Sequence, residues 1–343
     1  MIPIGPTWAA PFETLDRRQD MNKRNFAAAA GVLVAVTAMM VPLPARAAYP
    51  DRPVKLVVPY PAGGTTDVVA RMVARNMSTA LGQEVVVENK SGAATIIGVD
   101  SVAKSAPDGY TVLLATATSF AVNPHVYKSL PYKLDEFVPI GFINEAPILL
   151  VANASNAAQT LPELISWLKG RETAVATTGK GGFSHLTSAM FFGAINARFR
   201  DVPYRGEAPA LQDLLGGQVP LYFGSMPGTL PYVKAGKLRA YGVTSVDRSP
   251  TAPDIPSFTE QGQAEVVATS WFGLMAPKGT SAEVVSILEK ALNKAMQDKE
   301  LLARMAASGA VPRNFTAAQF ADYVERDHAR WGRIVRAANI SAE

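Results

Sequence analysis

Residues Val57 to Arg71 read VVPYPAGGTTDVVAR, and this stretch decides the fold of the chain. The short apolar run from Lys55 to Val58 predicts a buried strand. Pro61-Ala62-Gly63-Gly64 ends that strand, because glycine adopts backbone angles that other residues avoid. Apolar side chains then recur at helical spacing, at Val69, Met72, Val73 and Met77. The stretch therefore predicts a strand, a glycine turn and a helix.

The glycine turn is a candidate anion site. Thr65, Thr66 and Asp67 lie where the predicted helix begins, and Asp67 is predicted to cap it through a side-chain oxygen. Backbone N–H groups at a helix N-terminus, beside the carboxyl end of a strand, attract an anion. A well-capped turn in an ordinary α/β protein would show the same local pattern. The chain lacks GxGxxG and the Walker pattern, so a nucleotide ligand has little support.

The composition limits the class of protein. The chain has 343 residues, 48% of them hydrophobic and 18% charged, which allows two domains and a large core. The net charge is only +4 and no basic patch is interleaved with aromatics, so nucleic-acid binding has no support. The lack of cysteine excludes thiol catalysis, disulfides and cysteine-ligated zinc. His125, His185 and His328 show no metal-ligand spacing, so we expect no metal and no cofactor.

The N-terminal region predicts export. A basic segment begins at Met21, Ala27 to Val41 is uncharged, and Ala45-Arg46-Ala47 has the small-x-small form of a cleavage site. These features predict a signal peptide at 21–47 that is cleaved after Ala47, with an uncleaved anchor as the alternative.

Two details of this region concern the start of translation and the export route. Residues 1–20 have no role in the export scheme, and we interpret them as an upstream extension wrongly included before a true start at Met21. Lys23 stands where a twin-arginine signal has its first arginine, so both export routes stay open.

Strand and helix patterns alternate along the rest of the chain, which favours parallel sheets joined by crossover helices. Glu84 to Glu88 and Tyr110 to Ala115 are further predicted strands, and Val175 to Leu186 repeats the opening pattern of strand, glycine loop and helix. In open α/β sheets ligands lie outside the carboxyl ends of the strands, so these loops predict the wall of a cleft. The apolar runs Ile148 to Ala152 and Trp271 to Ala276 are predicted to cross into a second lobe and back.

Further segments share a pattern that is ordered and evenly spread from Tyr49 to the C-terminus. They are Pro59 to Arg71, Val87 to Ala93, Pro107 to Thr111, Asn123-Pro124, Tyr127 to Tyr132, Gly179 to Leu186, Val202 to Gly206, Pro209 to Leu211 and Asp213 to Val219. Together they resemble the Bug-type solute receptors, the periplasmic component of tripartite tricarboxylate transporters.

The resemblance implies a two-lobed α/β fold of the type II periplasmic binding protein kind. Each lobe would be a mainly parallel sheet with flanking helices, and the ligand cleft would lie between the lobes. Residues 48–149 and 272–343 would form lobe 1, and residues 150–271 would form lobe 2. The ligand would be a small organic carboxylate, and its binding would close the open lobes by a hinge.

The resemblance also implies a setting for the protein. It would be a periplasmic monomer and not an enzyme, and it would deliver its ligand to the membrane permease subunits of a tripartite tricarboxylate-type transporter. An orphan receptor that presents its ligand to a signalling protein is one alternative. A secreted α/β enzyme acting on a small acid is another, although no nucleophile, base or metal site is clustered in sequence.

The expected ligand site combines the two glycine loops with the ends of the other strands. The family binds a ligand carboxylate through backbone groups and ordered waters at these loops. The expected residues are Tyr60, Pro61, Ala62, Gly63, Gly64, Thr65, Asp67, Ala93, Thr116, Ser119, Thr177, Gly179, Gly181, Ser184, His185, Tyr204 and Arg205. Arg205 would pair with a distal carboxylate or else be a solvated turn residue. His185 would contact the ligand or else only brace the helix start.

The chain departs from the family pattern at two positions. Pro220 stands where the family usually has aspartate, and Gly224 stands where it usually has an acidic residue. A missing carboxylate in the cleft would remove a partner for a ligand amine. We therefore expect an unaminated acid in preference to an amino acid.

Overall fold

The computed structural model describes residues 1, 5, 49–179 and 181–338. The predicted signal peptide, its cleavage site and the start at Met21 lie outside these residues. Internal contacts group Tyr49 to Glu343 into one unit and Met1 to Ala48 into another. All of the described helices and strands lie in the first of these units.

Three parallel strands open the fold. The strand predicted at the start of the deciding stretch is β1 (Val54–Val58), which pairs with β2 (Val85–Asn89) on one side and β3 (Thr111–Thr116) on the other. The crossover helices are α2 (Thr65–Leu81) and α3 (Ile96–Ala103). Val69, Val73 and Met77 of α2 are buried, so the helical spacing read from the sequence is the one that packs α2 onto the core.

Two long strands join this part of the sheet to a second part. β4 (Phe137–Asn153) pairs with β9 (Thr269–Pro277) through residues 137–147. Through residues 148–153 it pairs instead with β7 (Leu221–Ser225) and β8 (Leu238–Val243). The apolar run that begins at Ile148 lies in the part of β4 that pairs with β7 and β8, and the run that begins at Trp271 lies in β9.

The second part repeats the alternation of strand and helix. β5 (Glu172–Thr177) pairs in parallel with β6 (Arg198–Pro203) and with β7. The helices are α5 (Leu161–Leu168), α6 (Phe183–Ala194), α7 (Glu207–Leu215) and α8 (Met226–Lys234). The strand order is β2-β1-β3-β9-β4-β7-β5-β6, with β8 and β10 (Val311–Pro312) also on β4.

The expectation of mainly parallel sheets needs a correction. β4 pairs antiparallel with β7, β8, β9 and β10, and β9 pairs antiparallel with β3. For β4 and β9 the direction follows from the connection, because β4 leads into the second part and β9 leads out of it. The fold is α/β with a mixed sheet.

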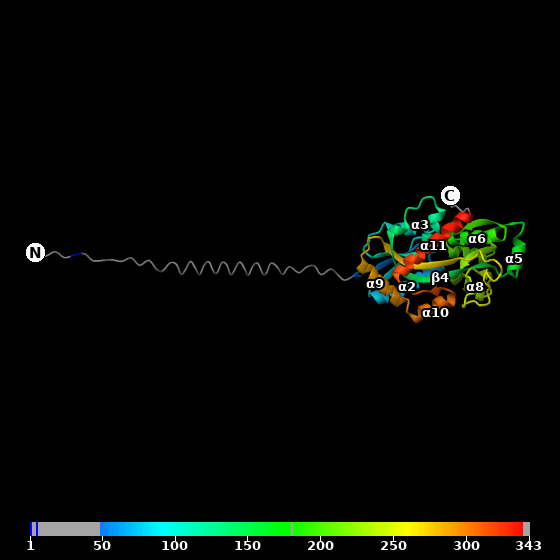
Figure 1. Ribbon diagram of the computed structural model, residues 1–343. Helices are drawn as coiled ribbons and strands as arrows, with labels where there is room; N and C mark the ends of the chain where they lie inside the picture. The colour runs from blue at the N-terminus through cyan, green and yellow to red at the C-terminus, as the bar shows by residue number, and fades with distance from the viewer. Residues whose placement is uncertain (2–4, 6–48, 180, 339–343) are drawn as a thin grey trace. The chain divides into compact units, whose positions relative to one another are not determined.

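The C-terminal helix contacts both parts. The chain after β9 forms α9 (Ala282–Ala295), α10 (Lys299–Ser308) and α11 (Ala317–Ala338), and the short turns earlier in the chain are η1 (Thr118–Val122), α4 (Asn123–Val126) and η2 (Leu134–Glu136). In Figure 1, α11, in red, runs from the side of α9 towards α6. It contacts η1 and α4 as well as α6, and the rings of Trp331 and Phe183 lie 4.9 Å apart.

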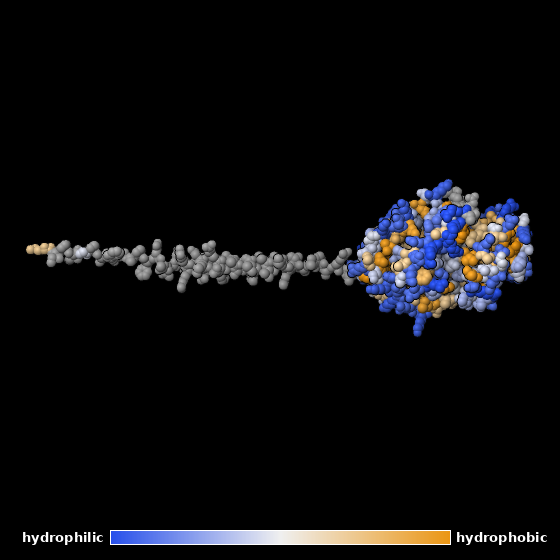
Figure 2. Space-filling view, viewed as in Figure 1, coloured by the Kyte–Doolittle hydropathy of each residue, from blue (hydrophilic) through white to orange (hydrophobic). Residues whose placement is uncertain are grey.

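Apolar side chains are buried in both parts of the sheet. Leu56, Leu114 and Leu274 pack with residues of α2 and α9. Phe191 of α6 packs with Phe223 of β7, with 5.6 Å between the ring centroids. On the face drawn in Figure 2, hydrophilic residues cover most of the surface and apolar residues form smaller patches between them. Within the described residues, no helix has the length and apolar character needed to cross a membrane.

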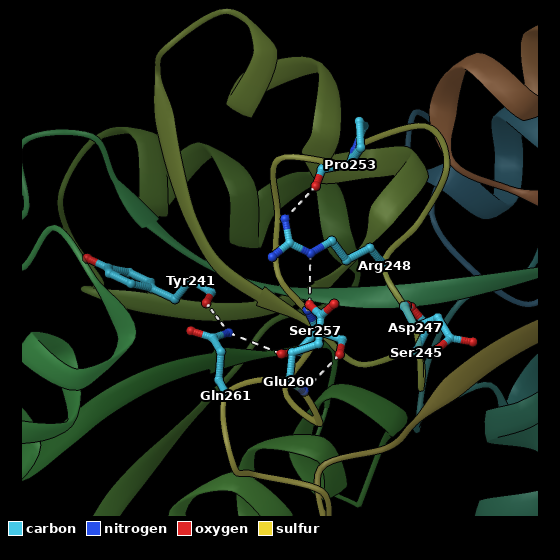
Figure 3. A network of polar contacts seen from close by, with 8 residues as sticks. All are labelled: Tyr241, Ser245, Asp247, Arg248, Pro253, Ser257, Glu260 and Gln261. Atoms are coloured by element: carbon cyan, nitrogen blue, oxygen red, sulfur yellow. Dashed lines mark hydrogen bonds and ion pairs between the residues drawn. The ribbon is translucent and has the colours of Figure 1, made fainter.

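A polar network fixes the long segment between β8 and β9 (Figure 3). Glu260 Oε2 accepts a hydrogen bond of 2.8 Å from Arg248 Nε and one of 2.9 Å from the backbone N–H of Ser257. Gln261 Nε2 donates to the carbonyl of Tyr241 on β8 at 3.0 Å. These bonds hold the segment against the edge of the second part of the sheet.

Candidate functional site

The first glycine loop connects β1 to α2. The cap residue of α2 is Gly64, and no side chain caps the helix there. Asp67 is the third helical residue, and its Oδ2 accepts a hydrogen bond of 3.0 Å from the backbone N–H of Gly63. The prediction that Asp67 is the N-cap is therefore wrong, because the helix begins earlier than expected. Asp67 instead braces the glycine loop from inside the first turn.

The Asp67 carboxylate is almost fully buried, with 4% of the residue exposed. Arg71 Nε donates to Oδ2 at 2.9 Å, and Asn89 Nδ2 donates to Oδ1 at 3.0 Å. Burial alone raises the pKa of Asp67, but the hydrogen bonds from Arg71, Gly63 and Asn89 outweigh it and hold the pKa below its usual value. Asn89 also donates to the carbonyl of Tyr60 at 3.0 Å, which ties the end of β2 to the same loop.

The second glycine loop connects β5 to α6 and is braced in the same way. Gly182 is the cap residue of α6, again without a capping side chain. Ser184 Oγ accepts from the N–H of Thr178 at 2.8 Å, and His185 Nδ1 accepts from the N–H of Gly181 at 2.9 Å. His185 therefore braces the start of the helix, which is one of the two roles that the sequence left open.

A cavity, here called the main pocket, brings the two glycine loops together. Its lining includes Tyr60, Pro61 and Gly64 from the first loop and Thr178, Phe183 and Ser184 at the second. Its volume is about 60 Å³. At roughly 10–15 Å³ for each water-sized group, this leaves room for about four to six such groups.

Several helices begin at the main pocket. Besides α2 and α6, α7 begins after Gly206 and α8 after Ser225, and none of these four cap residues forms a side-chain cap. The first turns of α2, α6 and α7 line the pocket, and α8 contributes its cap residue Ser225. The positive ends of the helix dipoles and their N-terminal N–H groups favour a negative charge in the pocket.

The structure adds a charged residue that sequence reasoning missed. Glu207, the first residue of α7, lines the main pocket. Its Oε1 accepts hydrogen bonds from Ser225, at 3.0 Å from the backbone N–H and 3.1 Å from Oγ. The expectation that the cleft lacks a carboxylate is thus wrong, because the carboxylate comes from α7 and not from position 224. Its place just after the carboxyl end of β6 was the signal that could have found it.

Two tyrosines lie near this carboxylate. Tyr60 donates from its hydroxyl to Thr118 Oγ1 at 3.1 Å. Burial raises the pKa of Tyr60, and it raises the pKa of Tyr222 well above its usual value, with the negative charge of Glu207 adding to the shift in both. Both hydroxyls therefore stay neutral in the pocket at physiological pH.

A second cavity, here called the side pocket, shares Tyr60 and Thr178 with the main pocket and has a volume of about 200 Å³. The predicted residues Ala93, Gly179, Tyr204 and Arg205 line it. Ala93, Ala94 and Thr95 have φ angles of 45°, 48° and 81°. Non-glycine residues rarely adopt such angles, and strain of this kind concentrates at functional sites.

Two polar residues of the side pocket are next to each other in the chain. Tyr204 donates to Asp213 Oδ2 at 2.7 Å, and burial together with this carboxylate raises the pKa of Tyr204 to about 12. Arg205 is exposed at the rim.

Other predicted residues lie behind the cavity walls or outside them. Thr116 and Ser119 are 1% and 0% exposed, and their hydroxyl oxygens lie 3.0 Å apart in an internal network that reaches Thr95. Thr177 is also buried and donates to Asp201 Oδ1 at 2.6 Å. Thr116 ends β3, which lies between β1 and β9, Ser119 lies in η1, and Thr177 ends β5, which lies between β6 and β7. Ala62 and Gly63 are exposed, Thr65 opens α2, and Gly181 is the residue that His185 holds.

In the described part of the chain, no group of three or more His, Cys, Asp or Glu side chains could hold a metal ion. Among the residues that the structure describes, the main pocket offers helix N-termini, hydroxyl groups, aromatic rings and the Glu207 carboxylate.

Comparisons with known proteins agree with this arrangement. The model of the family described as "Tripartite tricarboxylate transporter family receptor" matches residues 69–340. Protein BugT of Bordetella pertussis is 39% identical over 320 residues, which cover 92% of this chain and 98% of BugT.

Solved structures share both sequence and fold with the chain. The periplasmic binding protein BugD is 37% identical with a TM-score of 0.82, and the match covers 85% of this chain and 99% of BugD. MatC of Rhodopseudomonas palustris, solved with bound malate, is 31% identical with a TM-score of 0.81, and the match covers 84% of this chain and 100% of MatC. Rpa4515 of R. palustris, solved with adipate, is 32% identical with a TM-score of 0.81, covering 85% and 99%. The chain therefore belongs to the tripartite tricarboxylate transporter receptors of the Bug type, two-lobed periplasmic binding proteins that are solute receptors and not enzymes.

Proposed function

We propose that the protein captures a small organic carboxylate in the main pocket and delivers it to the membrane permease subunits of a tripartite tricarboxylate-type transporter. The observation that carries this proposal is the convergence of α2 and α6 on one cavity. Both helices begin at a glycine without a capping side chain. A ligand carboxylate placed there receives backbone hydrogen bonds and the positive ends of two helix dipoles.

The solved relatives support this ligand class. MatC was solved with malate and Rpa4515 with adipate, and both ligands are small carboxylates. In this chain the side pocket extends the main pocket towards Arg205. Arg205 would pair there with a distal group of a longer acid.

The proposal includes the lobes and their motion. Residues 48–149 and 272–343 form one lobe and residues 150–271 the other, with β4 and β9 as the connection. Ligand binding favours the closed arrangement, since the ligand contacts both glycine loops at once. The mature protein is a periplasmic monomer that begins at Ala48.

A thermal-shift screen tests the ligand class. A ligand at 100 times its dissociation constant adds about 2.7 kcal/mol of stability, which raises the melting temperature by on the order of 5 °C in a chain of this size. The panel holds monocarboxylates, dicarboxylates, tricarboxylates, amino acids and aromatic acids, with the matching alcohols as controls. If no acid stabilises the protein, and no ligand co-purifies with it, the proposal is contradicted.

Two further measurements test export and delivery. Mass spectrometry of the exported protein is expected to show an N-terminus at Ala48, and an intact N-terminus would contradict cleavage. Deletion of the permease subunits is expected to abolish uptake of the identified ligand. Unchanged uptake, with a changed transcriptional response to the ligand, would indicate the signalling alternative.

A further inference from the structure

The first glycine loop packs against the start of α7 at two glycines that have no side chain to hold the segments apart. A Cβ atom built on Gly206 would lie 2.8 Å from Pro61 Cδ and 3.1 Å from Pro61 Cγ. A Cβ atom built on Gly64 would lie 3.9 Å from Glu207 Cβ. The ring of Pro61 therefore lies directly on the backbone of Gly206, and the N-termini of α2 and α7 lie next to each other.

This contact joins the two proposed lobes. Pro61 and Gly64 belong to residues 48–149, whereas Gly206 and Glu207 belong to residues 150–271. The chain crosses between the lobes along β4 and β9, and none of these four residues lies in either strand. The contact therefore depends on how closely the lobes approach each other, because a hinge at the connecting strands would open it.

The same segments separate the main pocket from a larger cavity, here called the outer groove. Gly64, Glu207 and Ala208 line both cavities, so they form the boundary between them. The outer groove has a volume of about 600 Å³, and apolar residues of α2, α7, α8 and α10 form much of its lining. Separation of the first glycine loop from α7 would therefore open the main pocket towards the outer groove.

We infer that Gly206 is a positioning residue for ligand capture, because the absence of a side chain there lets the two lobes close over the main pocket. This inference rests on the proposed function and on its division into lobes. A side chain at position 206 would press on the ring of Pro61, and packed atoms do not accept a separation of 2.8 Å. The lobes would then stop short of the closed arrangement, and the ligand would lose contacts with one of them.

The backbone of Gly206 offers a competing explanation. Its φ angle is 147°, which side chains rarely tolerate, so alanine there strains the backbone whatever it contacts. The two explanations differ in their dependence on Pro61. Alanine at position 61 removes Cγ and Cδ and leaves 3.9 Å between the Cβ atoms of positions 61 and 206, which is an ordinary contact. Backbone strain at position 206 would be the same with either residue at position 61.

A disulfide between the lobes measures their approach without any ligand. The chain has no cysteine, so an introduced pair of thiols has no competitor. The 3.9 Å between the Cβ atoms of positions 64 and 207 suits a disulfide, for which this distance is about 3.5–4.5 Å. The reporter protein carries Gly64→Cys and Glu207→Cys. After reduction of the exported protein, the loss of free thiols in a glutathione redox buffer gives the rate of disulfide formation.

Every further variant is made in this reporter, so that the effect of the two cysteines cancels. Gly206→Ala is expected to slow disulfide formation roughly ten-fold, because only the closed fraction of the protein reacts. Addition of Pro61→Ala is expected to restore the rate to that of the reporter with Pro61→Ala alone. Gly217→Ala is the matched control, since Gly217 follows α7 with a φ angle of 72° but a Cβ atom there would meet no other atom within 4 Å. It is expected to leave the rate unchanged.

Calorimetric titration with malate and adipate connects closure to capture. These proteins keep the native residues at positions 64 and 207. Gly206→Ala is expected to weaken binding of the acid that the wild type binds by roughly ten-fold, in proportion to the lost closed fraction. The double variant with Pro61→Ala is expected to bind as tightly as Pro61→Ala alone.

The outcomes distinguish the inference from the proposed function. Equal slowing by Gly206→Ala with proline or alanine at position 61 would show backbone strain and overturn the inference. A reporter that forms no disulfide, or one that Gly206→Ala does not slow, would also overturn it, while the capture of carboxylates would stand. No binding by any acid of the thermal-shift screen would contradict the proposed function, and the role in capture with it, although the disulfide rates would still show whether the lobes meet at this contact.

Discussion

In both glycine loops a side chain of the following helix holds the loop backbone, but the two side chains differ in chemical type. In each, the third residue of the following helix accepts a hydrogen bond from the N–H of the residue before the cap, over 3.0 Å at Gly63 and 2.9 Å at Gly181. The acceptor is the Asp67 carboxylate in the first loop and the His185 imidazole in the second. The first acceptor is charged and tied to Arg71, whereas the second accepts through a ring nitrogen that carries no proton.

The two side chains differ in burial as well as in charge. Asp67 holds Gly63, Arg71 and Asn89 at once and is almost fully buried. His185 is only half-buried, with its ring 5.7 Å from that of Phe199.

The largest effect on ligand affinity is expected from Gly64→Val, which adds bulk to the first loop at the pocket wall. A Cβ atom at Gly64 would lie 3.9 Å from Glu207 Cβ, so the backbone has room for it but the added methyl groups would fill the approach to the loop. Ligand affinity is expected to fall roughly 100-fold, or about 2.7 kcal/mol. Calorimetric titration measures this, and circular dichroism checks that the variant is folded.

Gly193→Val is the matched control for this variant. Gly193 lies on α6, and a Cβ atom there would meet no other atom within 4 Å. Its affinity is expected to equal that of the wild type. If Gly64→Val also binds normally, the first loop does not hold the ligand.

The next largest effect is expected on stability, when the Asp67 carboxylate that holds the first loop is removed. Asp67→Ala removes the acceptor of three donors and leaves the N–H of Gly63 without its partner, at a cost of about 2–3 kcal/mol in the free energy of unfolding. Urea denaturation measures it. Asp322→Ala is the control, because Asp322 also pairs with an arginine four residues later but on an exposed helix face. Its expected cost is below about 0.5 kcal/mol, and equal costs for the two variants would show that Asp67 is not a brace.

These residues also show what the sequence could predict. β1 and α2 follow from local spacing, and strands at 148–152 and 271–276 follow from their apolar runs, because a strand buried on both faces is apolar throughout. Asp67 was assigned to the wrong helix position, since capping rules depend on where the helix starts and the sequence places that start only within a few residues. Its residue type and its closeness to the glycine loop were enough to single it out.

The rest of the site depends on contacts between distant segments. Glu207 and Ser225 meet only because α7 and α8 begin at the same cavity, although each directly follows a glycine that the sequence analysis named, Gly206 and Gly224. Thr116 and Ser119 were expected on the wall because they end a strand. The neighbouring strands and η1 bury them, and a loop that appears polar in sequence becomes internal. The arrangement of the strands and helices, and not the residue type, decides whether these side chains reach the cavity.

A smaller effect is expected from the second brace. His185→Ala removes the acceptor of the Gly181 N–H, and the loss of that hydrogen bond is expected to cost about 1 kcal/mol. His185→Asn is expected to recover part of it, because Oδ1 of asparagine occupies about the same position as Nδ1 of histidine. Thermal unfolding of the three proteins gives the order wild type, Asn, Ala. A cost for His185→Ala as large as that for Asp67→Ala would contradict the difference between the loops.

The smallest and most selective effect is in the pH dependence of stability. The folded protein holds the pKa of Asp67 below its usual value, which is about 3.9 in an unfolded chain. The unfolded state therefore binds a proton first as the pH falls, so the stabilisation from Asp67 is complete well above about pH 4 and is lost as the pH falls through the folded pKa. The variant Asp67→Asn lacks this titration. Urea denaturation of both proteins from neutral pH down to about pH 3 is expected to show the wild type losing its advantage over the variant, and because the two chains share every other carboxylate, the difference isolates Asp67. A difference that stays constant over this range would mean that Arg71 and Gly63 do not stabilise the charged carboxylate, and the first loop would then be no better fixed than the second.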